Sequence, residues 1–256
     1  MQAMNLVRNL AAALLLAAAV VGPAAAQDSD IVYELRTYTA APGTLATLSQ
    51  NFEDTVIPLF EKHGMTNVGY WTPTDPADER IIYLLSYDDR AARDAAWDAF
   101  AADPDFAAMM AERQEGGFMP IQFESVLLEP TDYSPSGGLE PAAAPRVFEF
   151  RTYSANEGKF DALNARFRDH TLGFFERHGM TNVAYFSVLP GQETPADTLI
   201  YLLAYPDQAA RDAAWRAFAA DPEWATVAAA SEADGPLLSA RPGSIMAAPT
   251  DYSAVQ

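Results

Sequence analysis

The chain repeats itself, and this repeat constrains the fold more than any other feature of the sequence. EKHGMTNVGYW at residues 61–71 returns 115 positions later as ERHGMTNVAYF at residues 176–186. Two further pairs of segments align in the same order: VYELRTYTAAPGTL (32–45) with VFEFRTYSANEGKF (147–160), and RAARDAAWDAFAADPDF (90–106) with QAARDAAWRAFAADPEW (208–224). Copies of roughly a hundred residues are long enough to be domains rather than solenoid units. The sequence therefore predicts two domains with one fold.

A segment rich in proline and glycine separates the two copies. PSGGLEPAAAP, residues 135–145, is unsuited to regular secondary structure and is typical of a linker. We therefore expect a first domain over residues 27–134 and a second over residues 146–256. Each has the sequence PTDYS near its end.

The first half of each copy reads as a strand followed by a helix. Residues 31–39 alternate in polarity and are rich in β-branched and aromatic types, as in a strand. Apolar residues then recur every three or four positions from Leu45 to Phe60, which predicts an amphipathic helix. We expect this helix to end at His63, with Gly64 in the left-handed conformation that often terminates helices.

The second half of each copy adds two strands, helical segments and a last strand. MTNVGYWT and IIYLLSY are the two expected strands, and Asp88 or Asp89 can cap the helix that follows. Asp103 and Pro104 begin a second helical piece, because proline is tolerated in the first turn. With a last strand in PIQFESVLLEP, the order is βαββαβ.

This order predicts an α+β fold made of two tandem ferredoxin-like domains. In that arrangement both helices cover one face of a four-stranded antiparallel sheet. The other face needs a partner, and the sheet of the second copy is the natural one. We expect the two sheets to pack into a dimeric α/β-barrel-like pseudo-dimer with a cavity between them.

Five phrases, YELRTYT, KHGMTNVGYW, IYLLSYDD, AARDAAWDAFAADPDF and PTDYSP, together resemble the NIPSNAP family. The resemblance covers both copies and nearly all of the chain after residue 26. It implies the dimeric α/β-barrel form of the ferredoxin-like fold. It implies little about activity, because the family is described through mitochondrial and vesicle-associated roles in animals. Relatives in the wider barrel superfamily include cofactor-free monooxygenases and haem enzymes, which is an analogy of fold.

The first strand of each copy carries an alternating set of polar side chains. Because side chains alternate across a strand, we expect the more apolar set to face the helices and the polar set to face the space between the sheets. The candidate residues lining that space are Glu34, Arg36, Tyr38, Glu149, Arg151 and Tyr153, with Tyr83, Tyr87, Tyr201 and Tyr205 from later strands. Two interpretations stay open: an ion-pair network that ties the sheets together, or a ligand site.

The three histidines give two further hypotheses. His63 and His178 stand at equivalent helix ends, where a histidine is favoured by the helix dipole, and the only nearby acids are the off-face Glu61 and Glu176. We interpret the pair as helix caps. His170 is not repeated, and it is either a residue at the edge of the apolar stripe or a haem ligand. Three scattered histidines and no cysteine do not make a zinc site, so we expect no metal and no cofactor, with haem as the alternative.

The N-terminus and the charge bear on location and partners. Residues 1–26 contain Arg8, an apolar run over residues 10–21 and a final Ala-Ala-Ala, which together predict a secretory signal peptide. We expect a periplasmic or secreted protein with no membrane span after cleavage. Its 15 remaining basic residues against 35 acidic ones oppose nucleic-acid binding.

The sequence favours a protein that binds a small molecule or a protein partner between its sheets and is not an enzyme. The alternative is a cofactor-free monooxygenase-like or haem-binding enzyme. The two differ in what the space between the sheets should contain: a well-formed cavity with unpaired Glu, Arg or Tyr side chains would favour the enzyme, and a filled interior with satisfied ion pairs would favour a scaffold.

The signal-peptide hypothesis predicts a mature N-terminus at Gln27 or within a few residues of it. Intact-mass measurement of the protein recovered from outside the cytoplasm checks this. Retention of residues 1–26 in that material would make the segment an anchor and contradict the prediction.

Overall fold

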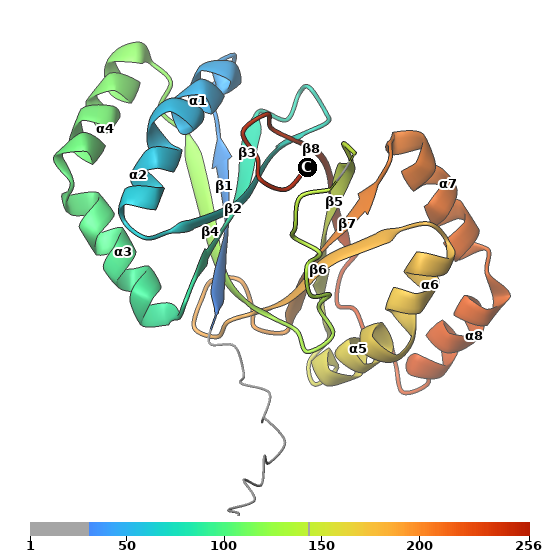
Figure 1. Cartoon of the computed structure of the whole chain (residues 1–256). Helices are drawn as coiled ribbons and strands as arrows, with labels where there is room; N and C mark the ends of the chain where they lie inside the picture. Colours follow the sequence, from blue (N-terminus) through green and yellow to red (C-terminus); the bar gives the residue numbers. More distant parts are fainter. Residues whose placement is uncertain (1–30, 143) are drawn as a thin grey trace, which may run out of the picture.

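The computed structural model describes residues 31–142 and 144–256, and it folds into one closed antiparallel barrel flanked by helices (Figure 1). The eight strands follow the order β1-β3-β2-β8-β5-β7-β6-β4 around the barrel. Their bounds are β1 Val32–Thr39, β2 Thr66–Pro73, β3 Arg80–Tyr87, β4 Gln122–Pro130, β5 Val147–Ser154, β6 Thr181–Val188, β7 Thr198–Tyr205 and β8 Gly243–Pro249. The predicted ferredoxin-like order and the predicted barrel of two sheets are both confirmed.

The helices of each copy cover the outside of its own four strands, on the two flanks of the barrel (Figure 1). Their bounds are α1 Leu45–Asn51, α2 Ile57–Lys62, α3 Arg90–Ala102, α4 Pro104–Gly116, α5 Phe160–Arg166, α6 Leu172–Arg177, α7 Gln208–Ala219 and α8 Pro222–Ser231. A π-helical turn joins the first two helices of each copy: η1 Phe52–Val56 and η2 Phe167–Thr171. The single amphipathic helix expected in each copy is thus continuous but locally widened.

Local sequence signals fix where these helices begin and end. Gly64 adopts φ 76° directly after α2, as its position after His63 predicts. Asp89, rather than Asp88, caps α3, because its side chain accepts a hydrogen bond from the backbone of Ala92. Asp103 caps α4, with Pro104 in the first turn as expected.

The two copies close the barrel through their last strands, which pair with the first strand of their own copy and, along the other edge, with the second strand of the other copy. β4 of the first copy pairs with β6 of the second, and β8 of the second pairs with β2 of the first. The PTDYS tails also reach the other copy: the backbone N–H of Tyr70 donates to Ser253 Oγ at 2.9 Å, and that of Tyr185 donates to Ser134 Oγ at 3.0 Å. Each domain is therefore completed by the other.

Apolar side chains from both sheets fill the inside of the barrel. Trp71 is its largest residue and packs against Phe148 and Phe150, with ring centroids 5.6 and 5.2 Å away. The Trp71 ring lies over Gly69, where an added Cβ would stand 2.3 Å from the indole. The second copy has Ala184 and Phe186 at these two places, so the smaller ring there leaves room for a methyl group.

Within the described residues, no helix is both long and apolar enough to cross a membrane. The expected signal peptide, residues 1–26, lies outside the described part of the chain.

The packing of Trp71 against Gly69 generates a prediction about the barrel core. Gly69→Ala should destabilise the protein by about 1–3 kcal/mol, because the methyl group overlaps the indole. Adding Trp71→Phe, which reproduces the pair found in the second copy, should restore most of that loss. Urea unfolding of the single and double variants measures both effects. A double variant no more stable than Gly69→Ala would show that the strand, not the ring, is perturbed.

Candidate functional site

The polar side chains of the first strands face the helices, not the space between the sheets. Tyr33, Leu35, Phe148 and Phe150 point into the barrel and belong to its apolar interior. The predicted orientation of Glu34, Arg36, Tyr38, Glu149, Arg151 and Tyr153 is therefore wrong. The physical reason is that a closed barrel shuts water out on all sides, whereas the helices supply charged partners on their inner faces.

Glu34 is the centre of a buried network in the first copy. Its carboxylate is 0% exposed and accepts hydrogen bonds from six donor atoms. The donors are Arg36 Nη1 at 2.6 Å, Arg93 Nη2 and Nε at 2.9 and 3.0 Å, Trp97 Nε1 at 2.8 Å, Ser125 Oγ at 2.6 Å and Tyr87 Oη at 3.1 Å. The carboxylate thus joins β1 to the neighbouring strands and to α3.

Glu149 repeats this arrangement atom for atom in the second copy. It is also 0% exposed. Its donors are Arg151 Nη1 at 3.0 Å, Arg211 Nη2 and Nε at 2.6 and 3.1 Å, Trp215 Nε1 at 2.7 Å, Ser244 Oγ at 2.6 Å and Tyr205 Oη at 2.9 Å. We call the two sets the carboxylate hubs. Because every lone pair of each carboxylate is engaged, neither hub presents a free acid or base to a substrate.

The hubs keep their carboxylates ionised. Burial alone would raise the pKa of Glu34, but the hydrogen bond from Arg93 and the charge of Arg36 outweigh it and lower the pKa to about 2. Burial likewise opposes the hydrogen bonds of Arg211 and Ser244 at Glu149, whose pKa is also lowered to about 2. Both groups are therefore anions throughout the physiological pH range.

The candidate tyrosines lie in the same layer between sheet and helices. Tyr83 Oη accepts from Arg36 Nε at 2.9 Å, and Tyr38 Oη accepts from Arg36 Nη2 at 3.1 Å. In the second copy Arg151 Nη2 donates to Tyr153 Oη at 3.2 Å. Tyr201 is fully buried, and its hydroxyl has no partner among the described residues. Burial raises the pKa of Tyr83 and of Tyr201, so both stay neutral phenols.

The hub partners on the helices were missed by the sequence reasoning. Arg93 and Trp97 stand four residues apart on α3, and Arg211 and Trp215 repeat them on α7. That spacing places both side chains on one helix face. A repeated Arg-Asp-Ala-Ala-Trp was therefore a readable signal that the helices carry the counter-charge for the buried glutamates.

The repeated histidines each contact an acid that is distant in sequence. His63 Nε2 lies 2.7 Å from Asp103 Oδ2, and His178 Nε2 lies 2.8 Å from Asp221 Oδ2. Both aspartates cap the next helix, so each contact ties one helix end to another helix start. The placement at helix ends agrees with the prediction, but the ring binds a carboxylate rather than open carbonyls. His170 is exposed in η2.

An apolar pocket of about 290 Å³ opens between the sheet and helices of the first copy. Its walls come from η1, α2, α4 and the start of β4 and include Val56, Phe60, Phe106, Met109, Met110 and Phe123. Arg113 from α4 brings a guanidinium group to the wall and is only 3% exposed. Its Nε donates to Asn51 Oδ1 at 2.8 Å.

The second copy is lined differently in the corresponding region, where Val227 and Ser231 border an open hollow of about 440 Å³ together with Arg166 and His170. Trp224 stands where the first copy has Phe106, and its ring centroid lies 4.5 Å from that of Phe218. Val227 and Ala228 replace the two longer methionines, and Ser231 replaces Arg113. The two domains therefore share one fold but differ at this pocket.

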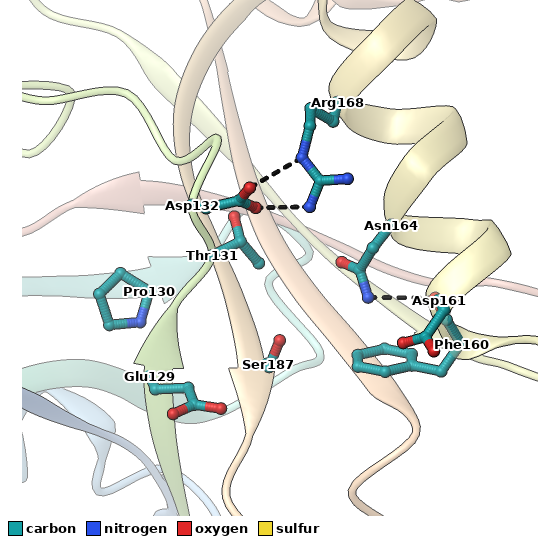
Figure 2. Close-up of a pocket in the computed structure, with 9 residues that line it drawn as sticks. All are labelled: Glu129, Pro130, Thr131, Asp132, Phe160, Asp161, Asn164, Arg168 and Ser187. Carbon is teal, nitrogen blue, oxygen red and sulfur yellow. Dashed lines mark hydrogen bonds and ion pairs between the residues drawn. The ribbon is translucent and has the colours of Figure 1, made fainter. Parts of the chain in front are cut away.

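Other hollows have different characters. Figure 2 shows a polar groove of about 460 Å³ where the tail of the first copy crosses α5 and η2, and its Asp132 is held by Arg168 at 2.6 and 2.8 Å. A smaller cavity of about 210 Å³ lies at one mouth of the barrel, with Leu35, Ile82 and Phe150 inside and charged Arg80 and Glu124 at its rim. This cavity is what remains of the expected space between the sheets.

The carboxylate hubs generate a prediction about stability and pH. Glu34→Gln should cost about 3 kcal/mol at pH 7, because it removes the charge that compensates two buried guanidiniums. A carboxyl whose pKa is lowered to about 2 stabilises the fold above its unfolded value near 4.5, and that stabilisation is lost as the pH falls toward 2. The difference in the free energy of unfolding between wild type and Glu34→Gln, measured by urea unfolding, should therefore shrink as the pH falls from 4.5 toward 2.

Glu149→Gln should behave like Glu34→Gln, since the hubs are equivalent, and the exposed Glu157→Gln serves as the control. If the difference in the free energy of unfolding between wild type and Glu34→Gln stayed constant from pH 7 to pH 2.5, it would contradict the assignment of an ionised, stabilising Glu34.

Comparison with known proteins places the chain in a family. No curated protein matches the sequence. Among solved structures, it is 24% identical to a NIPSNAP domain protein from Burkholderia xenovorans over 41% of this chain and 99% of that one, with a TM-score of 0.37. Across most of the chain it is similar in fold to a proposed monooxygenase from Fusobacterium nucleatum, at 8% identity, 86% and 92% coverage and a TM-score of 0.55.

An anthrone oxidase-like protein gives a similar result, with 13% identity, 89% and 94% coverage and a TM-score of 0.54. At such low identity these two likenesses concern the fold alone. The sequence profile of the NIPSNAP family matches residues 33–135 and again residues 148–254. The chain therefore belongs to the NIPSNAP family and carries two copies of its domain.

Proposed function

We propose that this protein is an exported, non-catalytic binding protein for a small apolar molecule, which it holds in the pocket of the first domain. The observation that carries the proposal is the apolar pocket of about 290 Å³ between the sheet and α4. Ligand pockets are typically concave, mostly apolar and supplied with few polar groups. The proposal of export rests on the signal-like composition of residues 1–26.

The walls of this pocket suit a ligand of variable shape. Met109 and Met110 come from α4, and Met119 comes from the loop before β4. Methionine side chains are flexible and polarisable, so they adapt to irregular apolar surfaces. Phe123 at the rim is 66% exposed, which leaves an apolar surface at the entrance.

The cavity at the barrel mouth is a weaker candidate for the site. It is smaller, about 210 Å³, and the strands around it place most of their side chains in a filled apolar core. A ligand in the first-domain pocket instead needs no rearrangement of the barrel.

The saturated hubs favour binding over catalysis. A monooxygenase without a cofactor needs a group that can take or give a proton to its substrate. The buried candidates for that role, Glu34 and Glu149, have all their lone pairs engaged by donors on three sides. The haem alternative needs a ligand imidazole beside a large pocket. His170 lines the open hollow of about 440 Å³ on the second copy, and no histidine lines the apolar pocket of the first copy among the described residues.

Filling the pocket tests the proposal. 1-Octanol, a neutral apolar probe, should bind the wild-type protein in saturation-transfer NMR. Phe106→Trp should abolish this binding and leave the melting temperature within a few degrees of wild type, because tryptophan already occupies the equivalent place in the second copy. Met110→Trp is a second filling variant.

Trp224→Phe in the second domain is the matched control and should leave octanol binding unchanged. Equal binding by wild type and by both filling variants would place the site elsewhere. A wild-type protein that binds no octanol at all would contradict the proposed function.

A further inference from the structure

Arg113 is a buried cation without a counter-charge. It is 3% exposed, and no carboxylate of residues 31–142 and 144–256 lies within the 4.0 Å ion-pair distance of its guanidinium. Its Nη2 is buried and has no hydrogen-bond partner in the described part of the chain. The neighbouring acid in sequence, Glu112, is exposed to solvent. An isolated buried charge is costly, so this site is incomplete as it stands.

Other buried arginines of the same layer show what a complete site contains. Arg36 pairs with Glu34 at 2.6 Å. In the second copy, Arg166 occupies the place of Asn51 and pairs with Glu232 at 3.2 Å. The buried arginine therefore lies on α4 in the first copy and on α5 in the second. In the second copy the protein itself supplies the acid that pairs with it. At Arg113 burial lowers the pKa, the opposite of what paired neighbours do at Arg36.

The surroundings of Arg113 combine this charge with apolar walls. Asn51 engages one edge of the guanidinium through Nε, and Phe52 packs beneath it with its ring centroid 5.5 Å from Cζ. These two contacts fix the orientation of the group, and Nη2 has no hydrogen-bond partner among the described residues. The same side chain lines the pocket that Met109 and Phe106 enclose.

We propose that the ligand of this pocket is a monocarboxylic acid with a short apolar chain or ring, whose carboxylate pairs with the Arg113 guanidinium. The apolar part lies along Phe106, Met109 and Met110. This inference rests on the proposed function and names its ligand class. A planar carboxylate matches the fork of a guanidinium, and charge-assisted hydrogen bonds are the strong ones in a desolvated site. A volume of about 290 Å³ limits the acid to a compact one.

Octanoate and 1-octanol have similar apolar tails, but only octanoate carries a carboxylate. Comparing their affinities therefore isolates the contribution of the charge. Calorimetric titration of the wild-type protein should show octanoate binding at least about tenfold more tightly than octanol. Arg113→Met should remove that preference: octanoate affinity falls by about tenfold or more, and octanol affinity stays within about threefold of wild type. The exposed Arg216→Met is the control and should leave both affinities unchanged.

The ligand-free stability of Arg113→Met supplies an independent readout. Because the substitution removes an uncompensated buried charge, its melting temperature should equal or exceed that of wild type. Arg113→Gln, which keeps a polar group without the charge, should lose the octanoate preference in the same way.

Octanol binding without any preference for octanoate, or a preference that survives in both Arg113 variants, would overturn the assignment of an acid and leave the pocket as a neutral site. Failure of wild type to bind either probe would instead overturn the proposed function itself. A marked loss of stability in ligand-free Arg113→Met would also overturn the inference, because it would mean that the protein already satisfies this charge.

Discussion

The pairing of a buried glutamate on the first strand with an arginine and a tryptophan on the third helix is the contact on which each domain depends. Glu34 and Glu149 are fully enclosed, yet both stay ionised because donors from neighbouring strands and from the helix converge on them. A charge at this depth is tolerated only with its complete set of partners. The position of the helix over the sheet is thereby specified by directional bonds, not by apolar packing alone.

The two domains are also incomplete without each other. The last strand of each copy pairs along its outer edge with the second strand of the other copy. Each PTDYS tail also hydrogen-bonds to the second strand of the other copy. The barrel interior is shared, so neither half can bury its apolar strand faces independently. The unit of folding suggested by this arrangement is the pair, although each copy carries the whole βαββαβ order.

The architecture could be predicted from the sequence because each helix and strand appears twice, once in each copy, so every local pattern could be checked against its repeat. Strand order, the glycine that ends α2 and the Asp-Pro start of α4 all follow from local chemistry. The orientation of β1 could not be obtained in that way. Alternation shows that Glu34 and Leu35 face opposite sides, but the choice of side depends on Arg93 and Trp97, which are about sixty residues away. The partner of His63 was missed for the same reason, since Asp103 approaches only in the fold.

Covalent linkage of the two domains has a consequence for stoichiometry. An assembly of two identical chains must display every pocket twice, and any substitution that closes one closes its symmetry mate. Here the halves are encoded separately, so the first has Phe106 beside its apolar pocket while the second has the larger Trp224 at the equivalent position. Because the two halves of a tandem repeat need not keep identical side chains, such a chain can bind one ligand in one half, while the other half still completes the barrel.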